Sequence, residues 1–123
     1  MTIYLISTRL RISLMLGTYV VVLITTPSRE EAERIARDLL SKKLAACVNM
    51  VSDVKSLFWW EEKIDEANES LLVIKTRLDQ MKELIESVKQ IHSYTVPEII
   101  ALPIITGNTR YLEWINQTIK KPE

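Results

Sequence analysis

The stretch Leu44-Ala-Ala-Cys-Val-Asn-Met-Val51, continued by Val54-Lys-Ser-Leu-Phe-Trp-Trp60, decides the fold of this chain. It has the composition of a long β-strand, yet it is apolar on both faces. A strand that is covered on one face alternates apolar and polar side chains. Here Val48 and Met50 lie on one face and Cys47 on the other, so both faces need cover. A chain of this length cannot easily supply that cover with its own helices, so we expect a sheet that packs against copies of itself.

Length and composition indicate one soluble domain. A chain of 123 residues buries about two-thirds of its unfolded surface in a single core. The 16 basic and 16 acidic residues give a formal net charge of zero, which argues against a general affinity for nucleic acid or an anionic membrane. We therefore expect copies of the chain and a small ligand or metal ion as partners, with no nucleic acid and no membrane.

The single cysteine, Cys47, excludes an intramolecular disulfide and favours a reducing compartment, so we expect a cytoplasmic protein. Residues 1–17 are interpreted as an extension outside the core, with Met15 as a candidate start of translation. The alternative is a signal peptide, because Arg9 and Arg11 precede an apolar run. Cleavage after that run would remove residues 19–24, which the fold needs as its central strand. Residues 18–121 are therefore assigned to a single domain.

The hydrophobic pattern predicts strands over Tyr19–Thr25, Leu44–Glu61, Ser70–Thr76 and Glu98–Ile105. Ser52-Asp53 predicts a bulge in the long strand, and Asp65–Asn68 predicts the tip of its hairpin. Pro103 predicts an edge position or a strand end, because proline cannot donate to a ladder.

Helical spacing predicts one buried face on each of three helices. The first begins at Ser28, which forms a capping box with Glu31, and its stripe is Ala32, Ile35, Ala36, Leu39 and Leu40. The second begins at an Asp79 cap, and its stripe is Met81, Leu84, Ile85, Val88 and Ile91. The third follows Gly107-Asn108 and ends at Pro122, with three side chains inward: Leu112, Ile115 and Ile119.

The order strand, helix, strand, strand, helix, strand, helix predicts an α+β class, the ferredoxin-like split βαβ sandwich with an added C-terminal helix. Two helices cover only one face of such a sheet. Because every predicted strand is apolar on both sides, we expect the free face to be an association surface. A hairpin that carries Trp59 and Trp60 suits the exchange of edge strands between subunits in a closed ring.

Few residues suggest chemistry. Cys47, beside two alanines, is typical of a small buried hydrophobe, and the alternative is a nucleophile or metal ligand. His92 follows the second helix in a loop, so we expect it to be accessible, either as a site residue or as a partner of helix carbonyls. The acids of residues 30–33 are typical of a solvated helix face. No phosphate loop and no His-x-x-x-His motif is present, so we do not expect an enzyme.

Polar and aromatic side chains gather at predicted strand and loop ends. Lys75 follows four apolar residues, which is an unusual place for a charge. We expect a ligand pocket between subunits, completed by a neighbouring hairpin and lined by Lys75, Tyr94, Glu98, Tyr111, Trp60 and Trp114.

Several phrases resemble the CutA family of divalent-cation tolerance proteins, in the family's order: Leu44-Ala-Ala-Cys-Val-Asn49, Phe58-Trp-Trp-Glu61, Lys75-Thr-Arg77, His92-Ser-Tyr-Thr-Val-Pro-Glu-Ile99 and Tyr111-Leu-Glu-Trp-Ile115. The resemblance spans about Thr18 to Ile119. It implies a cytosolic homotrimer of ferredoxin-like subunits, linked to tolerance of copper and other divalent metals. The chain departs from the family pattern at Glu62, where glycine is usual, and at Ser93, where proline is usual. We expect a strained turn at Glu62 and a less rigid loop beside His92.

Two functions are compatible with this resemblance. The first is a metal-responsive or weakly copper-binding trimer, with His92 and Cys47 as candidate donors and no cofactor required. Two donors per subunit are too few, so symmetry or a nearby carboxylate must supply the others. We expect His92 to carry a weak surface site and Cys47 to stay in the core. The alternative is a signalling trimer, similar in architecture to the nitrogen-regulatory signal transducers, that binds a small anionic metabolite at Lys75 and His92.

Overall fold

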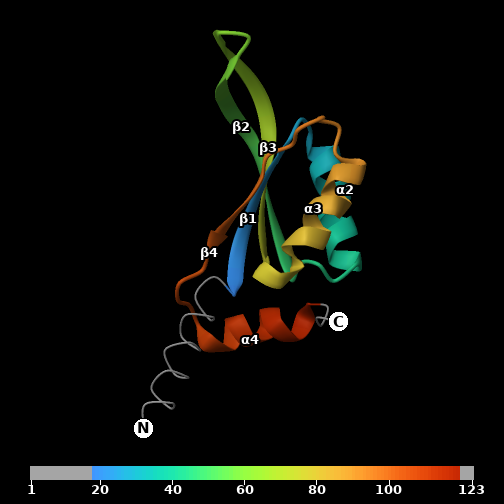
Figure 1. Ribbon diagram of the computed structural model, residues 1–123, viewed down its shortest axis with the longest axis vertical. Coiled ribbons are helices and arrows are strands. Elements are labelled where there is room, and N and C mark those ends of the chain that lie inside the picture. The colour runs from blue at the N-terminus through green and yellow to red at the C-terminus, as the bar shows by residue number, and fades with distance from the viewer. Residues whose placement is uncertain (1–17, 120–123) are drawn as a thin grey trace.

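An antiparallel sheet with two helices on one face forms the body of the molecule (Figure 1). The computed structural model describes residues 18–119, so the predicted extension and Pro122 lie outside the described residues. The elements in chain order are β1 (Tyr19–Thr26), α2 (Arg29–Ser41), β2 (Cys47–Trp60), β3 (Lys63–Arg77), η1 (Leu78–Gln80), α3 (Met81–Ile91), β4 (Ile99–Pro103) and α4 (Thr109–Thr118). The sheet order is β2-β3-β1-β4. This topology confirms the predicted α+β class and split βαβ order.

The core lies between the sheet and the helices α2 and α3. Alternate residues of β1 are buried, as a strand with one covered face requires. They pack with β3, α2 and α3 in one cluster that includes Val22, Ile24, Ile35, Leu39, Leu72, Ile74, Leu84 and Val88. Leu40, predicted on the buried stripe, is exposed, because the helix turns its side chain away from the face that carries Leu39.

The hairpin of β2 and β3 extends well beyond the rest of the sheet (Figure 1). Its ladder runs to Trp60 opposite Lys63, so the tip is Glu61-Glu62. The predicted tip at Asp65–Asn68 is wrong, because those residues pair with β2 inside the ladder. Both tip residues have positive φ, 48° and 65°, the requirement of a tight two-residue turn. The predicted strain at Glu62 is therefore confirmed, since side chains other than glycine disfavour this region.

Local sequence signals place several other features. The predicted bulge is confirmed by a register shift between Val51 and Val54, with Asp53 at a φ of 61°. Pro103 is the last residue of the edge strand β4, as predicted. The helix α4 begins after Asn108, whose side chain accepts from the amide of Arg110. It packs across one end of the sheet through the three predicted inward residues: Ile115 and Ile119 are buried, and Leu112 is partly buried against them.

The helix starts differ from prediction in two details. Ser28 caps α2 and its Oγ accepts from the Glu31 amide at 3.2 Å, but the Glu31 carboxylate contacts the loop after α3 instead of returning to Ser28. Asp79 does not cap α3, because its carboxylate accepts from Arg77 Nε at 3.0 Å and the helix begins two residues later at Met81.

The sheet face opposite α2 and α3 is apolar and uncovered in the single chain. Val51, Ile100 and Leu102 are 44 to 50% exposed there, on strands at both edges of the sheet. The projecting hairpin adds a further group of exposed apolar residues: Leu57, Phe58, Trp59, Trp60 and Ile64. Soluble monomers rarely expose apolar surface on this scale. None of the helices within residues 18–119 has the length and apolar character that a membrane span requires.

Candidate functional site

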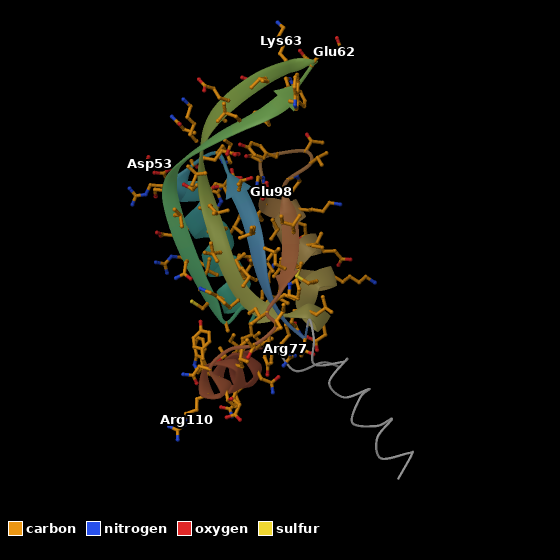
Figure 2. The ribbon with its side chains drawn as sticks, turned by 90° about the vertical axis from the view of Figure 1, so that its left-hand side faces the viewer. Asp53, Glu62, Lys63, Arg77, Glu98 and Arg110 are labelled. Carbon is orange, nitrogen blue, oxygen red and sulfur yellow. The ribbon has the colours of Figure 1, made fainter. Side chains whose placement is uncertain are left out.

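A cavity of about 900 Å³ lies between the β2–β3 hairpin and the loop that follows α3. Figure 2 shows the hairpin, with Glu62 and Lys63 at its tip, curving over the side of the sheet where Glu98 lies. The walls carry three aromatic rings and three carboxylates, contributed by Phe58, Trp60, Tyr94, Asp65, Glu69 and Glu98. Three of the residues predicted to bind a ligand, namely Trp60, Tyr94 and Glu98, therefore line one cavity.

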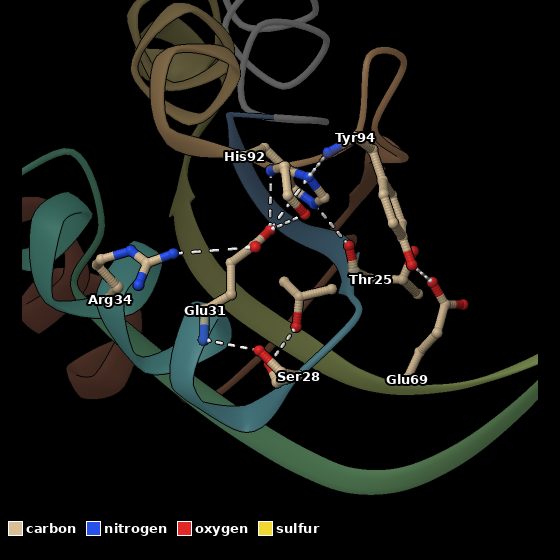
Figure 3. A network of polar contacts seen from close by, with 9 residues as sticks. Thr25, Ser28, Glu31, Arg34, Glu69, His92 and Tyr94 are labelled. Carbon is tan, nitrogen blue, oxygen red and sulfur yellow. Dashed lines mark hydrogen bonds and ion pairs between the residues drawn. The ribbon is translucent and has the colours of Figure 1, made fainter.

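A buried polar network supports the loop side of this cavity (Figure 3). The side chain of His92, at the C-terminal end of α3, is fully buried, and its Nε2 lies 2.8 Å from the carbonyl oxygen of Thr25. The Nδ1 atom accepts from the amide of Tyr94 at 3.0 Å. Because a carbonyl can only accept, Nε2 carries the proton in this arrangement. The prediction that His92 is accessible is therefore wrong: its ring joins the loop to β1.

Glu31 is the second member of this network. Its Oε2 accepts from both the amide and the hydroxyl of Ser93 at 3.0 Å, and it lies 3.3 Å from His92 Nδ1. Its Oε1 approaches the guanidinium of Arg34 at 3.9 Å. The prediction of a solvated face for these acids is wrong at Glu31, which is only 6% exposed, because α2 directs it toward the loop.

Tyr94 connects the network to the cavity. Its hydroxyl donates to Glu69 Oε2 at 2.7 Å, and its ring centroid lies 4.9 Å from that of His92. Burial and, next, the hydrogen bond to Glu69 raise the pKa of Tyr94 to about 12. The hydroxyl therefore keeps its proton at neutral pH and fixes the Glu69 carboxylate at the cavity wall.

A second group of predicted site residues lies at the other end of the sheet. Cys47 is half-buried and stands opposite Lys75 in the ladder, and the Lys75 ammonium donates to the side chain of Asn49. The rings of Tyr111 and Trp114 lie 5.5 Å apart. Burial, with a smaller effect of Cys47, raises the pKa of Tyr111. In the single chain Cys47 is thus only partly in the core.

The structure does not bring these two groups together within one subunit. Cys47 pairs with Lys75 in the ladder, and Lys75 pairs with Val21 of β1, whereas His92 hydrogen-bonds the carbonyl of Thr25. Val21 and Thr25 are four residues apart on β1, which separates the two groups by about 13 Å along the strand. Within residues 18–119, no three His, Cys, Asp or Glu side chains gather closely enough to hold a metal ion. A pocket shared between subunits remains a prediction.

Sequence reasoning missed Glu31, Glu69, Phe58 and Asp65 as site residues. The capping motif marked Glu31 as a helix-start residue, but no sequence signal indicated that its carboxylate contacts a loop 62 positions away. For Phe58 the signal was present, since it adjoins the predicted Trp60 in the hairpin.

The fold and these sites define an α+β domain of the split βαβ type that leaves an apolar sheet face uncovered. Residues 20–118 match the family described as CutA1 divalent ion tolerance protein. The chain is similar to the divalent-cation tolerance protein CutA of Archaeoglobus fulgidus, with 53% identity over 97 residues that cover 79% of this chain and 94% of the relative. The chain therefore belongs to the CutA1 family, and the resemblance seen in the sequence is confirmed.

Solved structures agree with this assignment. The crystal structure of CutA1 from Oryza sativa matches with a TM-score of 0.84 at 44% identity, over 88% of this chain and 99% of that chain. The divalent cation tolerance protein from Thermus thermophilus matches with a TM-score of 0.82 at 46% identity, over 83% of this chain and 99% of that chain. The similarity thus extends over the whole split βαβ unit.

Proposed function

We propose that this chain acts in divalent-cation tolerance as a homotrimer that responds to metal ions and binds copper only weakly. The names of its relatives support the cation-tolerance part. We infer the trimer from the apolar sheet face that includes Val51, Ile100 and Leu102. Residues 18–119 of one chain leave this face exposed, so another subunit has to cover it. The strands β2 and β4 are the two edges of the sheet, and pairing between edges of neighbouring subunits in a ring protects both.

Light scattering after size exclusion tests the assembly. We expect a mass three times that of the 14.2-kDa subunit, unchanged by dilution. Leu102→Glu places a charge on the proposed interface and is expected to dissociate the trimer. Leu78→Glu changes an equally exposed leucine outside the sheet and serves as the matched control. A monomeric wild-type protein at micromolar concentration contradicts the proposal.

The donors within one subunit do not fit a copper site. Cys47 is remote from His92. The two candidate metal donors that lie close together, His92 Nδ1 and Glu31 Oε2 at 3.3 Å, are buried and already accept hydrogen bonds. A metal bound there has to displace the amides of Tyr94 and Ser93. Weak binding follows from that competition, unless a neighbouring subunit contributes further donors.

Equilibrium copper binding to chelator-treated protein tests this part. We expect His92→Ala to weaken binding at least about tenfold, which is about 1.4 kcal/mol. Cys47→Ser should leave the affinity within about threefold. Circular dichroism confirms that both variants are folded. Loss of binding in the Cys47 variant alone, or a nanomolar wild-type affinity, contradicts the assignment.

A signalling trimer that binds a small anionic metabolite is the second candidate. The observation in its favour is Lys75, a half-buried lysine on the open face beside Cys47 and near the end of the sheet that α4 covers. A neighbouring subunit that covers this face would enclose the charge. A thermal-shift screen of carboxylate and nucleotide metabolites tests it, and Lys75→Gln should abolish any stabilisation found.

The proposed role is non-enzymatic and cytosolic. The separation of Cys47 from His92 supports a non-enzymatic role, because a catalytic nucleophile and its general base have to lie within hydrogen-bonding distance of each other. The lone cysteine supports a cytosolic location. Fractionation of cells that produce the full chain tests the location.

A further inference from the structure

The projecting half of the β2–β3 hairpin is joined to the sheet only at its base. Within residues 18–119, β1 pairs with β3 as far as Ser70, so residues 63–69 pair with β2 alone. The bulge between Val51 and Val54 interrupts the β2 ladder at the same level. A bulge bends its strand, and a two-stranded ribbon is only marginally stable by itself. Strand pairing therefore leaves the angle of the hairpin weakly determined.

One side-chain hydrogen bond crosses the base of the hairpin. Glu69 is the first residue of β3 beyond the ladder with β1, and its Oε2 accepts from the hydroxyl of Tyr94 at 2.7 Å (Figure 3). Among residues 18–119, no other side-chain hydrogen bond or ion pair joins the projecting residues 54–69 to the rest of the chain. The bond thus lies at the point where the hairpin leaves the sheet.

Tyr94 is itself held by the buried network. Its amide donates to His92 Nδ1 at 3.0 Å, and the two ring centroids lie 4.9 Å apart. His92 is fixed to the carbonyl oxygen of Thr25 on β1 at 2.8 Å. Ser93 is fixed to Glu31 on α2 by two hydrogen bonds of 3.0 Å. Both residues that precede Tyr94 are therefore anchored, so its hydroxyl has a defined position relative to the sheet.

The angle of the hairpin matters for assembly, because the hairpin carries much of the apolar surface that a neighbouring subunit has to cover. The exposed apolar residues on it are Leu57, Phe58, Trp59, Trp60 and Ile64. Association holds these side chains in one orientation relative to the sheet. Ordering a mobile segment on binding costs free energy, and a segment that is already oriented avoids this cost.

We propose that Tyr94 is a positioning residue for assembly: its hydrogen bond to Glu69 sets the angle of the hairpin and orients the apolar surface that a second copy of the chain covers. This inference rests on the proposed homotrimer and extends it, since it names the contact within each subunit that prepares the interface. It also gives the buried network of Glu31 and His92 a role, because that network holds Tyr94 in place.

Light scattering of the full chain in guanidinium chloride, at a denaturant concentration that partly dissociates the wild type, tests the effect on assembly. Tyr94→Phe removes only the hydroxyl, and we expect it to raise the protein concentration of half-dissociation at least about tenfold. Glu69→Leu should match it. Glu69→Gln keeps an acceptor oxygen and should stay within about threefold of wild type. Ser41→Ala removes a hydroxyl that donates to the Asp38 carbonyl oxygen at the end of α2 and should have no effect.

Distances between spin labels separate positioning from a general loss of stability. The label is attached at Lys63→Cys, beside the hairpin tip, in a Cys47→Ser background, and pulsed dipolar spectroscopy gives the distribution of distances between the tips of one trimer. We expect Tyr94→Phe to broaden this distribution at least about twofold. A label at Glu86→Cys, an exposed position on α3, is the control and should give the same width with and without the hydroxyl. A purely stabilising role leaves both widths unchanged.

The outcomes distinguish this inference from the proposed function. If the wild type is a trimer, and Tyr94→Phe changes neither the half-dissociation concentration nor the width of the tip distribution, the positioning role is overturned and the homotrimer stands. If Glu69→Gln dissociates as readily as Tyr94→Phe, the hydrogen bond is not the cause and the inference also fails. A monomeric wild type overturns both.

Discussion

Replacement of Glu31 by alanine removes the acceptor at the centre of the buried network. The carboxylate accepts two hydrogen bonds of 3.0 Å from Ser93 and lies 3.3 Å from His92 Nδ1. Hydrogen bonds to a charged partner contribute about 1.5–3 kcal/mol each. Ser93 itself is exposed, which favours the low end of that range, and the 3.9 Å contact with the exposed Arg34 guanidinium adds little. We therefore expect Glu31→Ala to lower the free energy of unfolding by about 3 kcal/mol.

Thermal melts followed by circular dichroism at one fixed protein concentration provide the assay. A loss of about 3 kcal/mol corresponds to a fall in Tm of about 10 °C for a domain of this size. Glu30→Ala is the matched control, because Glu30 is an exposed acid in the same first turn and its loss costs only the dipole effect of about 0.3–1 kcal/mol. Glu31→Gln, which keeps one acceptor oxygen, should fall between the two. If Glu31→Ala melts no lower than Glu30→Ala, the network does not stabilise the loop and the reasoning fails.

Three further predictions concern pH, α4 and the N-terminal residues. The fold raises the pKa of Tyr94 from 10.0 to about 12. The resulting contribution to stability is complete below about pH 10 and is lost as the pH rises toward 12. The difference in Tm between wild type and Tyr94→Phe should therefore shrink across that interval, and a constant difference argues against the shift. Arg77→Met removes the bonds of a buried guanidinium to Asp79 and Asn116 and should cost about 2–4 kcal/mol in chemical denaturation, whereas Arg37→Met at an exposed pair should cost under about 0.5 kcal/mol. Deletion of residues 1–16 should leave the Tm unchanged, because the β1 ladder begins at Tyr19, and a fall of several degrees would show that these residues stabilise the fold.

Much of the fold could be predicted because its signals are local. Hydrophobic periodicity located all of the strands and helices described within residues 18–119, except the short η1. Proline chemistry placed Pro103 at an edge strand, and a side-chain oxygen at Ser28 identified the start of α2. Each signal depends on residues that are neighbours in the sequence, so composition and spacing suffice to read it.

The hairpin tip was misplaced because it depends on register. The polar run of residues 65–68 is typical of a turn, yet these residues pair with residues 55–58 of β2. Strand pairing continues as far as Trp60 and Lys63, which leaves Glu61 and Glu62 as a two-residue turn with positive φ at both positions. Many cross-strand contacts together outweigh the local cost of the turn.

The sequence by itself determined the family, the order of the elements, most of the buried stripe of each helix and the excess of apolar surface that a sheet with one covered face cannot hide. Only the tertiary structure decided that Glu31 and His92 face one another, that Tyr94 joins Glu69, and that the predicted ligand residues divide between two ends of the sheet. The physical reason is that a side chain's partners depend on how distant segments pack. The residue types for the cavity are visible in the chain, but their common position exists only once the hairpin curves over the loop.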